Sequence, residues 1–369
     1  MSGEPAEGRA GGPGPVLVMG AGAIGSLLAA LLSSAGRDVI LVDRRATGAD
    51  PRSEVTVVEP TGRRVSARVR RVASTAAVGD VPDLAILAVK TNDLAGAIPG
   101  LARWPDVAVL TIQNGVGAEE IVRAARPAAG LIAGSITAPV QRIESGAVGW
   151  LGRGGIGLAP FSGPVGARVD DIVRMLTAEG LPARRMRNAR AMKWSKLLVN
   201  LPANALCALL DSDPRAVYAD AALFDVERRQ LLEAVAVMRA LGLRPTALPG
   251  ADARLLVLGA RLPAMLSRPM LRRVIGGARA GKPPSLQLHL REGRGPSEAR
   301  WLNGAVAREG RRLGVPVPVN ARLEALLGSA TSDPAIRARY VGRPDRLLGD
   351  LRTPMDRPGA AQLPTAPTE

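Results

Sequence analysis

Short apolar runs alternate with helical patterns through the first half of the chain. Four runs rich in Val, Ile and Leu are typical of strands buried on both faces: Val16–Met19, Asp38–Val42, Leu84–Val89 and Val107–Ile112. Between them, apolar positions recur with a helical period at Ile24–Ala35, Asp93–Leu101 and Ala118–Ala125. Two further runs, Glu54–Glu59 and Arg64–Val69, flank Pro60-Thr61-Gly62 and predict an added hairpin. Strands that alternate with helices form βαβ units, so we expect a parallel sheet, extended by Leu131–Ile136 and Trp150–Ala159.

After about Met186 the pattern becomes one of long amphipathic stretches. They cover Ala189–Leu210, Ala216–Leu241, Ala253–Arg273, Glu298–Leu313 and Ala321–Leu327. The chain therefore predicts an α/β domain over residues 15–186 and an all-helical domain over 187–330, with a cleft between them where ligands usually bind. Because both ends are polar or rich in Pro, we expect a flexible tail over residues 1–14 and a largely flexible extension over 331–369.

Composition excludes several kinds of catalytic site. The 369 residues include one cysteine, Cys207, and one histidine, His289, which leaves no intramolecular disulfide framework, thiolate cage, histidine-based metal centre or Ser-His-Asp triad. No metal is expected. The net charge of +16 is typical of nucleic-acid binding, but the arginines are dispersed and aromatic residues make up only 2% of the chain. With so little to stack on bases, we expect a solvated basic surface and no nucleic-acid partner.

The uncharged run over residues 16–36 is long enough to resemble a membrane span. Its glycines, and its division into a strand-like and a helix-like part, argue against one. The first 15 residues are polar and show no secretory signal. We therefore expect a cytoplasmic protein without a membrane partner.

A glycine-rich turn follows the first predicted strand and opens the first predicted helix. Its residues are Gly20, Ala21, Gly22, Ala23, Ile24 and Gly25, in the pattern GxGxxG of dinucleotide-binding folds. Gly20 allows the tight turn, Gly22 lets the backbone approach a pyrophosphate, and Gly25 lets helix and strand pack closely. The helix N-terminus offers N–H groups to the phosphates. The first domain is therefore predicted to be a Rossmann-type domain that binds NAD(P).

The residues after the second strand bear on which nicotinamide cofactor binds. Asp43 lies about 20 residues beyond the glycine turn, where a carboxylate can hold the ribose hydroxyls of NAD and repel a 2′-phosphate. Arg44 and Arg45 follow at once, and guanidinium groups can instead hold that phosphate. The residues alone do not decide whether the cofactor is NAD or NADP.

Lysine is rare in this chain, and its few uses cluster with asparagine. The four lysines are Lys90, Lys193, Lys196 and Lys282. Lys90 and Asn114 each follow a predicted strand, at the edge of the sheet where ligands bind in α/β folds. The alternatives are a solvated Lys90 and an Asn114-Gly115 turn.

The strongest candidate site from chemistry alone is a polar stripe in the first amphipathic stretch. Lys196, Asn200 and Asn204 are spaced i, i+4, i+8, so one helical face would present an ammonium and two carboxamides among apolar residues. Pro202 could kink this helix. Further along, Ser285 and Glu298 are candidates too, although each could be only a helix cap.

These motifs together resemble the ketopantoate reductase (2-dehydropantoate 2-reductase) family, from about Val16 to Leu327. The resemblance rests on the order of five segments: the GxGxxG turn, Ala88-Val89-Lys90, Gln113-Asn114-Gly115, the run KWSKLLVN at 193–200, and Ser297-Glu298 with Trp301-Leu302-Asn303-Gly304.

The resemblance implies residue roles. Lys196 would be the general acid, and Glu298 would contact the substrate hydroxyl. Asn114, Asn200, Asn204 and Ser285 would line the substrate or nicotinamide site with Lys90 nearby, and Arg44 would hold the 2′-phosphate of NADPH.

The implied activity is the NADPH-dependent reduction of 2-dehydropantoate to pantoate, as in pantothenate biosynthesis, with NADH as a second usable cofactor. The partner would be a small 2-oxo acid, and a homodimer is compatible with the sequence. Two alternatives remain at this point: a related Rossmann dehydrogenase of another 2-oxo or 3-hydroxy acid, and a non-catalytic NADP-sensing protein.

Overall fold

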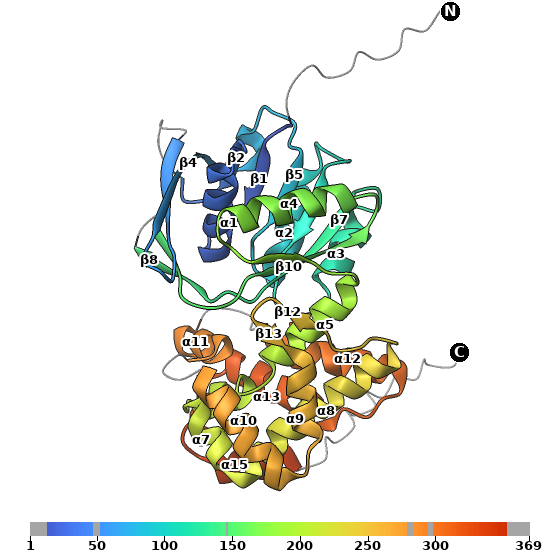
Figure 1. Ribbon diagram of the computed structural model, residues 1–369. Helices are drawn as coiled ribbons and strands as arrows, with labels where there is room; N and C mark the ends of the chain where they lie inside the picture. The colour runs from blue at the N-terminus through green and yellow to red at the C-terminus, as the bar shows by residue number, and fades with distance from the viewer. Residues whose placement is uncertain (1–12, 47–51, 145–146, 279–282, 294–297, 353–369) are drawn as a thin grey trace, which may run out of the picture. The chain divides into compact units, whose positions relative to one another are not determined.

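The computed structural model describes residues 13–46, 52–144, 147–278, 283–293 and 298–352. The chain divides into two compact units (Figure 1). The first is built from the residues up to Asn200 together with Val235–Gly259, and the second from Leu201–Ala234 together with the residues from Ala260 onwards. The predicted flexible ends fall partly outside the described residues, at 1–12 and 353–369.

A mixed sheet is the centre of the first unit. Its described strands follow the order β11-β10-β7-β6-β5-β1-β2-β4-β3-β9-β8. The parallel middle consists of β1 (Val16–Met19), β2 (Val39–Val42), β4 (Arg64–Val72), β5 (Leu84–Leu87), β6 (Ala108–Thr111) and β7 (Leu131–Ile136). The remaining strands are β3 (Arg52–Val58), β8 (Val140–Glu144), β9 (Ala147–Trp150), β10 (Ile156–Ser162) and β11 (Ala183–Arg185).

The middle of the sheet is parallel, as expected, but three pairs of its strands are antiparallel. Strand β3 runs antiparallel to β4, β8 to β9, and β10 to β7. The first two pairs are joined by connections of a few residues, and a parallel pair would need a crossover of a dozen or more. Strand β10 returns to the sheet without a crossover helix in front of it. The predicted hairpin, β3 with β4, is confirmed.

Helices cover both faces of the sheet: α1 (Ala23–Ser34), α2 (Leu94–Ala97), α3 (Ala118–Ala125) and α4 (Gly166–Ala178) (Figure 1). The side chains of β1 alternate between the two faces. Val16 and Val18 pack in one apolar cluster with α1 and α4, and Leu17 and Met19 pack in another with α2 and α3. Burial on both faces explains why these strands are uniformly apolar. The helix expected over Asp93–Leu101 is instead split between 3₁₀ turns and the short α2.

The first unit also contains α5 (Ala189–Asn200), the small hairpin of β12 (Ala247–Leu248) and β13 (Ala251–Asp252), and most of α9 (Ala253–Arg261). Helix α5 packs against β7, β10 and β12. This placement makes α5 part of the sheet domain rather than of the helical one.

The described part of the second unit is helical, although the range predicted to be all-helical, 187–330, also includes α5 and the β12–β13 hairpin of the first unit. The helices of the second unit are α6 (Ala205–Leu210), α7 (Pro214–Ala219), most of α8 (Ala221–Ala240), α10 (Ala264–Ala278), α11 (Ser285–Glu292), α12 (Asn303–Leu313), α13 (Pro318–Ser332), α14 (Pro334–Ala338) and α15 (Pro344–Arg352), with a 3₁₀ turn at Glu298–Trp301. The α/β domain followed by helices confirms the predicted fold class.

Four of the predicted long helices are interrupted, and one of them, Glu298–Leu313, divides into a 3₁₀ turn and α12. The stretch 189–210 forms α5 and α6, and between them Ala203 adopts a left-handed backbone with φ of 56°. The stretch 216–241 breaks at Asp220, and 253–273 breaks at Pro263, because proline cannot continue the hydrogen-bond ladder. The expected single face carrying Lys196, Asn200 and Asn204 therefore does not exist.

The expectation of a largely flexible segment after residue 330 is wrong for residues 331–352. Helices α14 and α15 form there, and Tyr340 and Leu347 are buried. The Asp333 side chain caps α14 by accepting a hydrogen bond from the Ala335 N–H. Within the described residues, no helix is long and apolar enough to cross a membrane, and the uncharged run 16–36 is divided between β1 and α1.

Candidate active site

The glycine-rich turn has the geometry that its sequence predicts. Gly20 has a φ of 111°, and a side chain at Gly25 would place its Cβ 1.9 Å from the Gly20 carbonyl oxygen. A Cβ at Gly22 would meet no atom within 4 Å, so open space lies beside the backbone there. Within the described residues, no side chain caps the start of α1. The free amides of that first turn can therefore bind phosphate oxygens.

Asp43 is buried directly after β2, and its carboxylate is already paired with Arg45. Its carboxylate accepts hydrogen bonds from the Arg45 backbone N–H at 3.1 Å, from Nε at 3.1 Å and from Nη2 at 3.4 Å. Burial alone would raise the pKa of Asp43, but the hydrogen bonds and charge of Arg45 outweigh burial and lower the pKa. Asp43 is therefore an ionised carboxylate paired with one arginine, while the neighbouring Arg44 is exposed.

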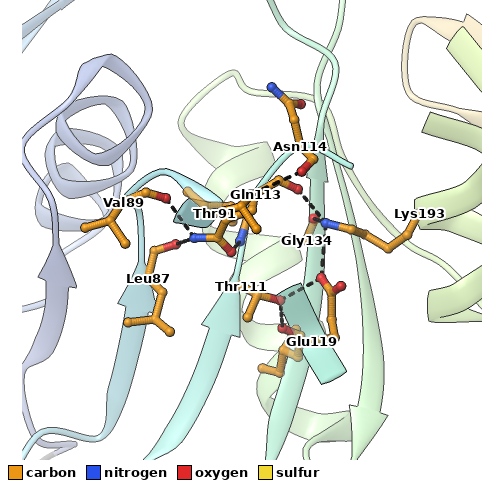
Figure 2. Close-up of polar contacts among 11 residues, drawn as sticks. Leu87, Val89, Thr91, Thr111, Gln113, Asn114, Glu119, Gly134 and Lys193 are labelled. Carbon is orange, nitrogen blue, oxygen red and sulfur yellow. Dashed lines mark hydrogen bonds and ion pairs between the residues drawn. The ribbon is translucent and has the colours of Figure 1, made fainter. Parts of the chain in front are cut away.

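Lys90 and Asn114 follow adjacent parallel strands, β5 and β6, as predicted. Gln113 ties the two strand ends together, because its Nε2 donates to the Leu87 oxygen at 2.6 Å and the Val89 oxygen at 3.0 Å (Figure 2). Lys90 is exposed, Asn114 is half-buried and Gly115 has a φ of 83°. The chain bends at Asn114 and Gly115, so both the functional and the turn interpretation stay open, and the Asn114 side chain extends from that bend.

A buried lysine that the sequence did not single out as a site residue is found beside this turn. Lys193 of α5 forms an ion pair with Glu119 of α3, with 3.0 Å between Nζ and Oε1 and side chains only 4% and 2% exposed. Nζ also donates to the carbonyl oxygens of Gln113 at 2.5 Å and Gly134 at 3.4 Å (Figure 2). Thr111 donates from Oγ1 to the same Glu119 oxygen at 2.9 Å. The scarcity of lysine was the one signal that could have drawn attention to it.

The predicted substrate residues divide between the two units. Lys196 and Asn200 are half-buried on α5 in the first unit. Asn204 precedes α6 in the second unit and is 4% exposed, and its Oδ1 accepts a hydrogen bond from the Leu286 N–H at 3.2 Å. That bond brings Asn204 to the start of α11, where Ser285 is exposed as the first residue. Glu298 is half-buried at the start of its 3₁₀ turn.

Arg142 is a second residue that sequence patterns did not identify. It lies on β8, which packs beside α1, and its guanidinium donates a hydrogen bond to the Ala21 carbonyl oxygen in the glycine-rich turn. The two residues are separated by 121 positions, so no local motif connects them.

Comparison with known families identifies the family of the chain. A profile described as "Ketopantoate reductase PanE/ApbA" matches residues 16–163, and one described as "Ketopantoate reductase PanE/ApbA C terminal" matches residues 188–330. The chain belongs to the ketopantoate reductase family. The resemblance noted in the sequence is thereby confirmed, and it extends over both units of this family member.

Individual relatives of this ketopantoate reductase family member span nearly its whole length. The 2-dehydropantoate 2-reductase of Halobacterium salinarum is 29% identical over 323 residues, which cover 86% of this chain and 99% of the relative. The crystal structure of a PanE/ApbA family ketopantoate reductase from Ralstonia eutropha JMP134 has a TM-score of 0.70 at 26% identity, covering 88% of this chain and 99% of that one. D-mandelate dehydrogenase, solved with NADH and anilino(oxo)acetate, shares the fold, with a TM-score of 0.67 at 22% identity over 86% and 98% of the two chains.

The space beside Gly22 yields a prediction for cofactor binding. Gly22 has an extended backbone, with φ of −73° and ψ of −178°, that valine can adopt. We expect Gly22→Val to keep the melting temperature within a few degrees of native and to raise the Kd for NADPH at least about tenfold, or ~1.4 kcal/mol, because the side chain would occupy the space needed by the pyrophosphate. Gly79→Val is the control, since a Cβ at Gly79 also meets no atom within 4 Å. Equal affinities in both variants, measured by fluorescence titration, would contradict this role.

Proposed function

We propose that the chain catalyses the NADPH-dependent reduction of 2-dehydropantoate to pantoate. The observation that carries this proposal is the anchoring of α5, which bears Lys196, on the carbonyl of Gln113, directly before Asn114 at the carboxyl edge of the parallel strands. In α/β folds that edge borders the dinucleotide site. The names of the full-length relatives support the substrate.

Each residue has a definite task in the proposed reaction. When bound, the reduced nicotinamide supplies a hydride to the keto carbon. Lys196 donates the proton to the oxygen that becomes the hydroxyl, and general acid catalysis of this kind is worth about 10²–10⁴-fold. Asn114 and Asn200 orient the reacting groups in the first unit.

The second unit contributes residues that bind the substrate. Glu298 accepts a hydrogen bond from the substrate hydroxyl, while Ser285 and Asn204 bind its polar ends. The Asn204 side-chain oxygen is engaged by the Leu286 N–H, so its amide N–H₂ is the group assigned to the substrate.

The cofactor is assigned as NADPH, with NADH as the weaker alternative. Asp43 would repel a 2′-phosphate if it were unpaired, but Arg45 occupies both of its carboxylate oxygens. Arg44 forms no ion pair with any described residue, which leaves its guanidinium for the phosphate. Arg142 reaches the glycine-rich turn and is assigned to the pyrophosphate, which NADPH and NADH share.

These assignments predict different effects of two arginine variants on the KM values for NADPH and NADH. Arg44→Ala should raise the KM for NADPH much more than that for NADH, because only NADPH carries the 2′-phosphate. Arg142→Ala should raise both KM values by a similar factor. Steady-state kinetics with each cofactor separate the two effects. A native enzyme that prefers NADH would show that Asp43 decides cofactor choice, and a cofactor-selective effect of Arg142→Ala would remove it from the pyrophosphate.

The activity itself is tested with a panel of 2-oxo acids, including 2-dehydropantoate, by following NADPH consumption. We expect 2-dehydropantoate to have the highest kcat/KM, and Lys196→Ala to lower kcat at least about 10²-fold with an unchanged Kd for NADPH, because only the proton donor is lost. NADPH binding without turnover of any 2-oxo acid would favour the sensor alternative. A native kcat in Lys196→Ala would exclude Lys196 as the acid.

A further inference from the structure

The three N–H groups of the Lys193 ammonium match three acceptors. These are the Gln113 carbonyl oxygen at 2.5 Å, Glu119 Oε1 at 3.0 Å and the Gly134 carbonyl oxygen at 3.4 Å (Figure 2). An ammonium has three donors, so Lys193 has none left for a substrate. Lys193 is therefore not an alternative proton donor to Lys196.

The acceptors belong to three different parts of the first unit. Gln113 follows β6 and precedes Asn114, Gly134 lies in β7, and Glu119 lies in the first turn of α3. Through its side chain, Gln113 also holds the Leu87 and Val89 carbonyls at the end of β5, next to Lys90. A continuous series of hydrogen bonds thus joins α5 to both strand ends that carry the predicted cofactor residues.

Lys193 constrains how α5 is rotated about its axis, together with Ser195, whose Oγ accepts a hydrogen bond from the Thr246 N–H at 2.9 Å. Lys196 follows Lys193 by three residues, which is about 300° of rotation and ~4.5 Å of rise in an α-helix. Any change in the direction of Lys193 would therefore turn the side chains of Lys196 and Asn200 with it. Apolar contacts of the buried Trp194 and Leu198 are less directional than hydrogen bonds to fixed carbonyls.

Stability alone does not require this pair. Replacing a buried ion pair by apolar groups of similar volume is often neutral or stabilising, because desolvation offsets the attraction between the charges. Apolar groups, however, cannot form directional hydrogen bonds to particular backbone carbonyl oxygens.

We propose that Lys193, held by Glu119, is a positioning residue for catalysis: it orients α5 so that Lys196 faces the nicotinamide site beside Asn114. This inference rests on the proposed function, in which Lys196 is the proton donor. Lys193 itself touches neither substrate nor cofactor, so it is not a catalytic residue.

The test is a double variant with a matched control. Lys193→Met with Glu119→Gln removes both charges together and leaves no unpaired buried charge. Arg190→Met with Glu120→Gln removes the exposed ion pair, 3.7 Å long, between the same two helices. We measure kcat, the KM for the 2-oxo acid, the Kd for NADPH and the melting temperature on each preparation.

The proposal expects a specific loss in the buried-pair variant. Its kcat should fall at least about tenfold, or ~1.4 kcal/mol in the activation barrier, while the KM and the Kd for NADPH change less than about threefold and the melting temperature stays near native. The exposed-pair control should keep kcat within about twofold. A native kcat in the buried-pair variant, or an equal loss in the control, would overturn the proposal.

A second variant decides the matter if the double variant fails to fold. Glu119→Asp alone keeps both charges, so no buried charge is left unpaired, but its side chain is shorter by one methylene and holds Lys193 less closely, so we expect kcat to fall about threefold, or ~0.65 kcal/mol. An unchanged kcat in this variant overturns the inference. An inactive native chain in the same assay would instead overturn the proposed function, and the positioning role of Lys193 with it.

Discussion

Two opposite charges, Lys193 and Glu119, are buried together where α5 meets the sheet, and each alone would be costly there. Removing one partner of a buried pair costs roughly 3–5 kcal/mol, because the other is left without compensation. Here the ammonium is also satisfied by the Gln113 and Gly134 carbonyls, and Glu119 by the Thr111 hydroxyl. This arrangement makes α5 a fixed extension of the sheet edge. The placement of Lys196 relative to the carboxyl ends of the strands depends on it.

Cofactor binding at this site depends on which group each nearby arginine contacts. Arg45 is committed to Asp43, which reduces the repulsion that this carboxylate would exert on a 2′-phosphate. Arg142 contacts the backbone of the glycine-rich turn from the far edge strand, β8. Arg44 remains exposed next to the paired carboxylate. An arginine-rich composition therefore does not mean an undifferentiated basic surface, because single guanidinium groups have distinct positions around the dinucleotide turn.

Local patterns predicted the parts of this structure that local physics determines. The buried strands, the helices α1 and α3, and the glycine-rich turn follow from apolar periodicity and from backbone sterics at Gly20 and Gly25. The prediction of one polar stripe from Lys196 to Asn204 was wrong because the chain turns at Ala203. The spacing of residues along a helix does not show where that helix ends. Lys193 was missed as a site residue because its acceptors include backbone carbonyls 59 and 80 residues away, which leave no trace in side-chain patterns.

The central claim is that Lys196 on an α5 fixed by Lys193 is the group that protonates the substrate oxygen. The most direct measurement is a crystal structure of the chain with NADP⁺ and pantoate bound. We expect Lys196 Nζ to lie about 2.6–3.2 Å from the pantoate hydroxyl oxygen, with Lys193 still bound to the Gln113 carbonyl and to Glu119. A complex in which another group holds that oxygen, or in which Lys193 has left the Gln113 carbonyl while Lys196 still contacts the substrate, would contradict the account.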